Sequence, residues 1–265
     1  MRPGFTGPKP RLFGHRGAAG LAPENTLVSF HRARDEGADI LEIDVHATAD
    51  GEIVVIHDPT LDRTTDGGGP VAALSAVEIA RLDAGFRFTP DGGRSFPYRG
   101  QGVGVPRLVD LLHAFPDMPL NIEIKQGTPG IVAEVVALVR RARAPVVLAA
   151  EHDAIMQQIR NLAPDIPTSL AAGEVAAFMA AIAVGEHPVL PEGAVALQIP
   201  PYFGGATLVS TASVAAAHAL GVEVHVWTIN DPEEMRRLIA LSCDGIMSDF
   251  PGRARAVIDE MTRHA

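Results

Sequence analysis

The chain alternates short apolar runs with longer segments of helical periodicity over almost its whole length. Short runs rich in Val, Ile and Leu are typical of buried strands, whereas apolar residues spaced three and four apart indicate amphipathic helices. Alternation of this kind predicts a parallel sheet whose strands are joined by helices, and eight strands predict a (β/α)₈ TIM barrel. The length of 265 residues fits one such barrel.

The apolar runs set the expected element boundaries. We expect barrel strands at residues 11–14, 40–45, 120–124, 146–149, 168–171, 195–199, 222–228 and 245–248, with an extra hairpin strand at 53–56. We expect helices between them at residues 24–37, 131–143, 152–163, 174–184, 211–220, 232–240 and 252–263. Glu24 and Asn25 are interpreted as capping residues of the first helix.

Residues 59–106 interrupt this rhythm with a short helical piece at 75–82 and a region rich in Gly and Pro. A loop of this length is usually functional or a small insertion. It begins beside His57 and ends before the helix that leads to Glu123, so we predict an insertion that caps the barrel mouth. Its aromatic residues either contact substrate or form a small core of the insertion itself. We therefore expect a single domain, 1–265, with 59–106 as a capping insertion.

Composition narrows the possible partners. The 22 basic and 32 acidic residues give a net charge of −10, which disfavours nucleic acid and anionic membrane surfaces. The single cysteine, Cys243, excludes an intrachain disulfide and is interpreted as a small buried residue. No apolar run is long enough for a membrane span, so we expect a cytoplasmic protein without stable membrane insertion. The first ten residues are predicted to be a flexible lead-in, and the oligomeric state is left open.

The segment 41–58 gathers acidic and imidazole side chains on one hairpin. Glu42 and Asp44 alternate with apolar residues, so both carboxylates lie on one face of a strand. If Asp50 and Gly51 form a two-residue turn, the register places His57 opposite Asp44. Two carboxylates and an imidazole then converge, which is unfavourable unless a cation joins them.

Two other strand ends carry polar residues of the same kind. His15 and Arg16 follow the first strand, and Glu123 and Lys125 end the strand at 120–124. Active sites of TIM barrels lie at the carboxyl ends of the strands, where all these side chains fall. Three carboxylates, two histidines and two basic groups predict a hard-cation site with acid–base and phosphate-binding residues. Trp227 belongs to the same rim and either fills the barrel or contacts substrate.

Several motifs in order give the chain a family resemblance. The stretches GHRGAAGLAPENTLVSF, GADILEIDVHATADGEIVVIHDPTLDRTT, NIEIK, VEVHVWTINDPEEM and CDGIMSDFP resemble the glycerophosphodiester phosphodiesterase family over nearly the whole chain. The resemblance implies that His15 and His57 are the acid–base pair, that a divalent metal is bound by Glu42, Asp44 and Glu123, and that the phosphate is bound by Arg16 and Lys125. One departure is Glu151-His152, where the family often has Ser-Phe, on the leaving-group side of the pocket.

The resemblance implies a metal-dependent phosphodiesterase that hydrolyses glycerophosphodiesters, small-molecule substrates, to sn-glycerol 3-phosphate and an alcohol. Oxygen-only ligands favour Mg²⁺, Ca²⁺ or Mn²⁺ over zinc. No Ser, Thr or Cys is placed to form a covalent phosphoenzyme, which leaves a substrate hydroxyl or a metal-bound water as the nucleophile; we favour the hydroxyl. Two alternatives stay open: a lysophospholipase D-like enzyme, which should have an exposed apolar rim, and a non-catalytic metabolite-binding barrel, which should lack a site residue. The sequence leaves open which histidine is the acid.

Overall fold

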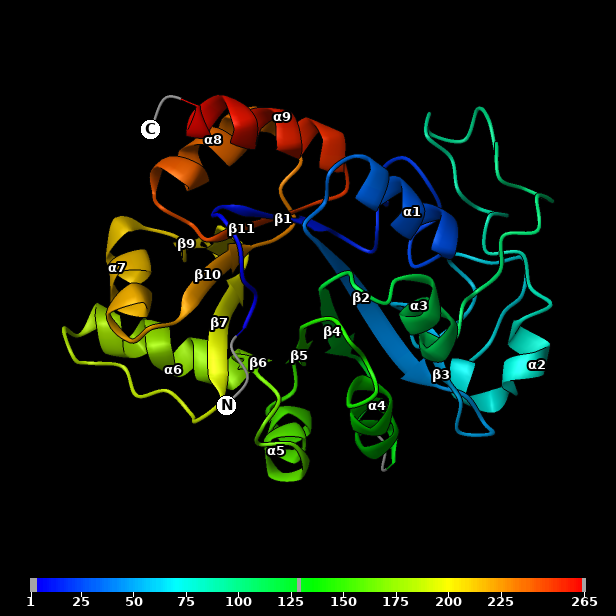
Figure 1. Cartoon of the computed structure of the whole chain (residues 1–265), viewed down its shortest axis with the longest axis horizontal. Coiled ribbons are helices and arrows are strands. Elements are labelled where there is room, and N and C mark those ends of the chain that lie inside the picture. The colour runs from blue at the N-terminus through cyan, green and yellow to red at the C-terminus, as the bar shows by residue number, and fades with distance from the viewer. Residues whose placement is uncertain (1–3, 128–129, 264–265) are drawn as a thin grey trace.

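The computed structural model describes residues 4–127 and 130–263 and shows a closed barrel of eight parallel strands (Figure 1). In barrel order the strands are β1 (Arg11–Gly14), β2 (Ile40–Ala47), β4 (Leu120–Ile124), β5 (Val146–Ala149), β6 (Thr168–Ser169), β7 (Ala194–Ile199), β10 (Glu223–Val226) and β11 (Gly245–Ser248). The barrel closes because β1 pairs with both β2 and β11. Outside it, β3 (Ile53–Val55) runs antiparallel to β2. The predicted TIM barrel with an extra hairpin strand is confirmed.

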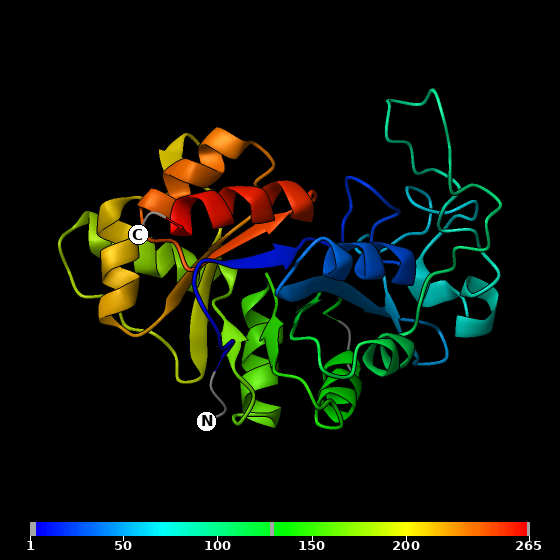
Figure 2. The same ribbon diagram turned by 45° about the horizontal axis from the view of Figure 1, so that its top comes forward.

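Helices surround the barrel in both views (Figures 1 and 2). They are α1 (Leu27–Asp35), α3 (Leu108–Ala114), α4 (Ile131–Val139), α5 (Asp153–Leu162), α6 (Ala172–Ala183), α7 (Thr211–Ala219), α8 (Pro232–Ala240) and α9 (Pro251–Thr262). A small hairpin, β8 (Tyr202–Phe203) and β9 (Ala206–Thr207), follows β7. Among the described residues, no helix combines the length and the apolar character needed to cross a membrane.

The main core lies between the strands and the helices and is mostly aliphatic. Phe30, Phe115 and Phe178 are its only aromatic members among the described residues, in keeping with the low aromatic content. Cys243 is buried in the same core, and burial raises the pKa of its thiol to about 12. The sequence-based interpretation of Cys243 as a small buried residue therefore holds.

The register of the β2–β3 hairpin differs from the predicted one. Val45 pairs with Val55, and the amide of Ile56 donates to the carbonyl of Asp44, so the predicted pairing of His57 with Asp44 is wrong by one residue. A slip of one residue would turn every side chain of a paired strand to the opposite face. His57 is not turned away from the site, because it lies beyond the end of β3 in an irregular segment.

The cause of the difference is the length of the turn. The amide of Thr48 donates to the carbonyl of Glu52 at 2.9 Å, which leaves three loop residues instead of two. Gly51 has a φ of 84°, and its amide donates to the carbonyl of Thr48 at 3.1 Å. A turn followed by a left-handed glycine is a common three-residue hairpin loop. The Asp50-Gly51 dipeptide suits this loop as well as the two-residue one.

The insertion 59–106 lies beside β3 and α1 in both views (Figures 1 and 2). It contains the short helices η1 (Val71–Ala73) and α2 (Ala76–Ile79). A separate apolar cluster joins it to the outer hairpin strand: Val54, Ile56, Leu61, Val71, Ile79, Ala84, Val103 and Val105. The ring of Phe88 packs edge-on against Tyr98, and the guanidinium of Arg99 lies over the rings of Phe86 and Phe96. These contacts favour the interpretation that the aromatics form a small core of the insertion.

The described part of the N-terminal segment, residues 4–10, does not match the predicted flexible lead-in. It packs across the amino-terminal end of the barrel, where Phe5 is buried against Phe13 and His225. The guanidinium of Arg11 holds this segment by donating to the carbonyl oxygens of Phe5 and Thr6. The Pro and Gly content that suggested flexibility instead shapes an ordered path below the strands.

Glu223 is the centre of a charged network at this end of the barrel. Its carboxylate accepts hydrogen bonds from Arg11 at 2.7 Å and His225 at 3.0 Å, and lies 2.9 Å from the Lys9 ammonium. Burial acts to raise the pKa of this carboxyl group, but hydrogen bonds from His225 and Lys9 outweigh it and lower the pKa to about 2. A carboxyl group with a lowered folded-state pKa contributes stability above its unfolded pKa and loses it as the pH falls.

Replacing Glu223 with Gln should therefore cost stability at pH 7 and progressively less as the pH falls. The shift from 4.5 to about 2 corresponds to a loss of about 3 kcal/mol at neutral pH. Between pH 4.5 and 2 the difference from wild type should shrink progressively, because wild-type Glu223 becomes protonated in the folded protein only as the pH falls through about 2. Urea unfolding at pH 7 and pH 3 measures this, and the difference between Glu223→Gln and wild type should be clearly smaller at pH 3. As a control, Asp35→Asn, in an exposed pair with Arg34, should change little at either pH.

Candidate active site

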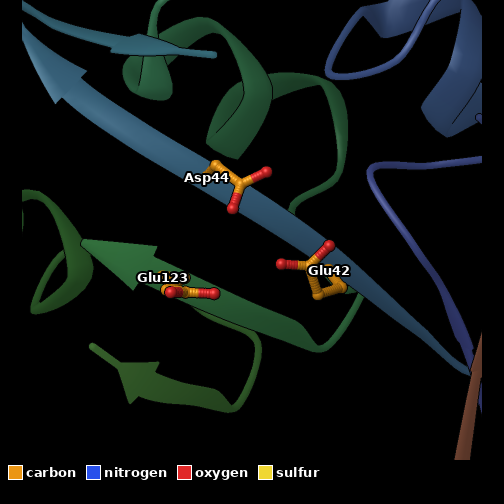
Figure 3. Close-up of side chains that lie close together, drawn as sticks. All are labelled: Glu42, Asp44 and Glu123. Atoms are coloured by element: carbon orange, nitrogen blue, oxygen red, sulfur yellow. The ribbon is translucent and has the colours of Figure 1, made fainter. Parts of the chain in front are cut away.

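Three carboxylates meet at the carboxyl ends of two neighbouring strands (Figure 3). Glu42 and Asp44 lie on β2 and Glu123 on β4, and Asp44 is paired in register with Glu123. Ile43, between the first two, points to the main core instead. One oxygen from each carboxylate lies within 4.8 Å of the others, and Glu42 and Asp44 are almost fully buried. The structure thus brings together the three residues predicted to bind a metal.

A tight loop after β1 carries His15 and Arg16 into the same region. Arg16 has a left-handed backbone, with a φ of 48°, and its amide donates to Glu42 at 2.9 Å. Gly17 follows with a φ of 87°, and a Cβ atom there would lie 2.4 Å from the Ser29 hydroxyl oxygen. Only glycine therefore fits the loop as it stands.

Each of the two histidines is held by an aspartate. The Nδ1 atom of His15 lies 2.7 Å from Asp249, and the Nδ1 atom of His57 lies 2.7 Å from Asp58. An aspartate at Nδ1 fixes the orientation of the ring and leaves Nε2 for proton transfer. Sequence reasoning missed both aspartates. The available signals were the adjacency of Asp58 to His57 and the position of Asp249 directly after a strand.

The free nitrogen of His15 faces a hydroxyl group. Its Nε2 atom lies 3.4 Å from the hydroxyl oxygen of Thr228, which follows β10. Sequence reasoning did not place Thr228 in the site, and its role in the reaction is not assigned by this contact. Trp227, one residue earlier, lies at the same strand end and is 42% exposed. This position agrees with the predicted rim, and its contact with substrate stays a prediction.

The two predicted phosphate-binding groups lie among the carboxylates. The Lys125 ammonium is 2.7 Å from Glu123 and 3.3 Å from Asp44. Arg16 donates from Nη1 to Glu24, and its Nε is 3.3 Å from Asp44. Although it is ion-paired with Asp44, this buried nitrogen has no hydrogen-bond partner among the described residues. This N–H group can donate a hydrogen bond to a further anionic oxygen.

Glu24 and Asn25 do not cap the first helix as predicted. Thr26 is the N-cap of α1, and its hydroxyl accepts from the amide of Ser29. The side-chain amide of Asn25 donates to Asp44 at 2.9 Å, while Glu24 pairs with Arg16. Both residues therefore support the carboxylate cluster. The Pro-Glu-Asn-Thr stretch is typical of a helix N-terminus, which suggested capping. The hydrogen bond from Asn25 to Asp44, nineteen positions away, could not be predicted from the local sequence.

The electrostatics show an excess of buried negative charge. Burial and the neighbouring charge of Asp44 raise the pKa of Glu42 to about 7, and burial also raises the pKa of Glu123. For Asp44, burial is outweighed by Lys125 and Arg16, which lower its pKa. Three carboxylate oxygens without nitrogen or sulfur ligands form a donor set that fits a hard divalent cation.

The buried carboxylates also affect the pKa of His15. Burial of the imidazole acts to lower its pKa, but the hydrogen bond with Asp249 and the charge of Glu42 outweigh it, so the pKa is raised.

The departure at Glu151-His152 lies just beyond β5, where both side chains are exposed. It leaves the carboxylates and the histidine–aspartate pairs unchanged.

Fold and site together define a TIM-barrel protein with a candidate acid–base and cation site at its carboxyl end. The model of the glycerophosphoryl diester phosphodiesterase family matches residues 15–253, and the chain belongs to this family. It is 32% identical to a glycerophosphodiester phosphodiesterase of Caldanaerobacter subterraneus subsp. tengcongensis, over 92% of this chain and 95% of the relative. It is 26% identical to a lysophospholipase D of Rattus norvegicus, over 95% and 87% respectively.

A solved structure resembles the whole barrel. It is that of an Oleispira antarctica phosphodiesterase in complex with the product sn-glycerol 3-phosphate. The TM-score is 0.75 at 26% identity, with 94% of this chain and 97% of the other covered. The fold and the family are thus established by independent comparisons.

The raised pKa of Glu42 predicts that its charge destabilises the metal-free protein. A carboxyl group with a raised folded-state pKa contributes stability below its unfolded pKa, and loses it as the pH rises through about 7. In chelator, Glu42→Gln should therefore be more stable than wild type at pH 8, by a few kcal/mol at most, and similar at pH 4.5. The glutamine oxygen can still accept from the amide of Arg16. Thermal unfolding measures the effect; equal stability at pH 8 would contradict it.

Proposed function

We propose that this protein is a metal-dependent phosphodiesterase that hydrolyses glycerophosphodiesters to sn-glycerol 3-phosphate and an alcohol. The observation that carries the proposal is the convergence of three buried carboxylates with two histidine–aspartate pairs at one end of the barrel. Membership of the family supports the reaction class, and the product complex of the Oleispira relative supports the substrate class. The complete set of site residues disfavours a non-catalytic metabolite-binding barrel.

Glu42, Asp44 and Glu123 would hold the divalent cation, for which Mg²⁺, Ca²⁺ and Mn²⁺ are the candidates. When bound, such an ion neutralises the phosphodiester and polarises a nonbridging oxygen. Asn25 keeps Asp44 oriented through its 2.9 Å hydrogen bond. Hydrogen bonds of this kind fix the orientation of a metal-binding side chain, so that the metal is bound in a defined geometry.

Arg16 and Lys125 bind the phosphate in this proposal. The Nε atom of Arg16 still lacks a hydrogen-bond acceptor, and a phosphate oxygen would supply one. Lys125 is held at the mouth by Glu123 and Asp44, whose charges outweigh burial and raise its pKa, so it stays cationic. Two fixed cations stabilise the charge that develops on the phosphoryl oxygens.

His15 and His57 transfer the protons. One takes a proton from the attacking hydroxyl group and the other gives a proton to the leaving alkoxide. The attacking group is either water or the substrate's own hydroxyl next to the phosphorylated carbon, which is already held near phosphorus. Attack by that hydroxyl would release the alcohol and form a cyclic phosphate, which water would then hydrolyse to sn-glycerol 3-phosphate with the two histidines exchanging roles. Asp249 and Asp58 keep both rings oriented throughout, since each occupies Nδ1.

We also propose that residues 1–265 form one domain and that 59–106 caps the barrel mouth. The apolar cluster shared with β3 ties the insertion to the barrel beside His57. Its aromatic residues contact one another, so the cap would shape the site without stacking on substrate.

A lysophospholipase D-like activity is the second candidate, and one observation favours it. Three aromatic side chains are exposed at neighbouring strand ends: Tyr202 at 55%, Phe203 at 73% and Trp227 at 42%. β7 and β10 are paired, so the hairpin that follows β7 lies beside Trp227. Exposed apolar groups at a mouth suit a lipid alcohol, and this is the apolar rim that such an enzyme requires.

Chelation should abolish hydrolysis, and Mg²⁺, Ca²⁺ or Mn²⁺ should restore it and raise the melting temperature. Glu123→Gln should lose most activity, whereas Glu134→Gln, an exposed carboxyl group on α4, should keep it. The assay compares glycerophosphocholine with lysophosphatidylcholine, with and without chelator. Preference for the second substrate would favour the lysophospholipase D-like activity. Full turnover in excess chelator would exclude the metal, and turnover of neither substrate would exclude the proposed function.

His15→Ala and His57→Ala should each lower kcat by at least ~10²-fold, the lower end for general acid–base catalysis. The double variant should lose much less than the product of the single losses, because the two groups act in one reaction. His113→Ala, at an exposed position on α3, is the control and should retain wild-type kcat. A histidine whose removal leaves kcat within about twofold has no part in proton transfer.

A further inference from the structure

Arg63 joins two acidic residues that belong to different parts of the site. Its Nε and Nη2 atoms donate to Asp58 at 2.6 and 3.0 Å, and its Nη1 and Nη2 atoms donate to Glu24 at 2.7 and 2.8 Å. Asp58 is the residue that holds His57, and Glu24 comes from the loop after β1. One guanidinium thus makes paired hydrogen bonds to two carboxylates at once.

The turn that carries Arg63 is itself fixed. Leu61 is fully buried in the apolar cluster shared with β3, and its amide donates to the carbonyl of Gly69. Thr65 closes the turn by donating from both its amide and its hydroxyl to the carbonyl of Leu61. Arg87, farther along the insertion, donates to the carbonyl of Thr65 at 2.9 Å. The backbone on both sides of Arg63 is therefore anchored.

We propose that Arg63 is a positioning residue for His57: Glu24 anchors the guanidinium, the guanidinium holds Asp58, and Asp58 orients the imidazole. This inference rests on the proposed function, in which His57 transfers a proton. It gives the insertion a defined part in catalysis without contact between the insertion and the substrate.

The exposure of Arg63 and its effect on Asp58 indicate a positioning role for this residue and not mainly a stabilising one. The side chain of Arg63 is 46% exposed, and exposed ion pairs contribute little to stability. Hydrogen bonds from Arg63 also lower the pKa of Asp58, so the aspartate stays ionised and remains an acceptor for His57. The expected consequence of losing Arg63 is a change at His57 larger than any change in unfolding.

Lysine cannot replace this arginine. The guanidinium is a planar fork that serves two carboxylates with paired hydrogen bonds, whereas an ammonium is a single point of charge. Arg63→Lys therefore keeps the charge and removes the geometry, which makes it the informative variant.

Arg107 provides a matched control. Its side chain is 45% exposed, it also borders the insertion, and it makes two 2.9 Å hydrogen bonds to the carboxylate of Asp110. It has no contact with His57 or with the three metal-binding carboxylates in the described structure. Arg63→Lys and Arg63→Ala are compared with Arg107→Lys and Arg107→Ala in steady-state hydrolysis of glycerophosphocholine and in thermal unfolding.

Both Arg63 variants should lower kcat by about 10–100-fold, as loss of supporting hydrogen bonds around a site typically does, with KM within about twofold. Both Arg107 variants should keep wild-type kcat. In an Asp58→Asn background, Arg63→Lys should cost much less than it does alone, because both act through one ring. Wild-type kcat in Arg63→Lys, equal losses in the two arginine sets, or losses that multiply in the double variant would each overturn the proposal.

A second readout does not depend on turnover. In ¹⁵N spectra of the histidine rings, assigned with His57→Gln, wild-type His57 should carry its proton at Nδ1, facing Asp58. In Arg63→Lys the two ring nitrogens should move toward the average of both tautomers, whereas Arg107→Lys should match wild type. An unchanged His57 spectrum in Arg63→Lys refutes the positioning role. If the wild type shows no hydrolytic activity but Arg63→Lys still changes the His57 spectrum, only the proposed function is refuted.

Discussion

The burial of three carboxylates at one end of the barrel is the constraint on which the site depends. Ions of like charge in a low-dielectric interior repel strongly, so the surrounding residues must offset their charge. Lys125 and Arg16 do so with positive charge, and Asn25 does so with a hydrogen bond to Asp44. The compensation is incomplete, since the pKa values of Glu42 and Glu123 remain raised. The remaining imbalance is what a divalent cation would remove.

The barrel determines which side chains can meet at this point. The pairing of β2 with β4 sets the carboxylates beside one another, and the closure of β1 on β11 brings His15 to Asp249. The three carboxylates lie within the paired strands, where the register fixes their direction, whereas His15, Arg16 and Lys125 lie just beyond strand ends. The tight loop around Gly17 then turns the amide of Arg16 onto Glu42, which a longer loop could not do as rigidly.

The sequence predicted the barrel and the principal site residues because strands and helices are encoded locally, by periodicity and by turn residues. It could not decide the hairpin register, since Asp50-Gly51 suits both a two-residue and a three-residue loop. It also missed Asp249 and Thr228, because their partner, His15, lies more than 200 positions away and meets them only after the barrel closes. The flexible lead-in predicted for the first ten residues fails at Phe5 for the same reason, since the burial of Phe5 depends on the finished barrel.

The two histidines are alike in the sequence but stand in different surroundings. Asp249, which holds His15, is in turn bound by the neutral side chain of Asn230 at 2.6 Å. Asp58, which holds His57, is bound instead by the cationic Arg63. A positive charge behind a carboxylate weakens it as a proton acceptor more than a neutral amide does. The barrel thus supports one histidine and the insertion the other, and a reaction that needs one proton donor and one acceptor can use this difference.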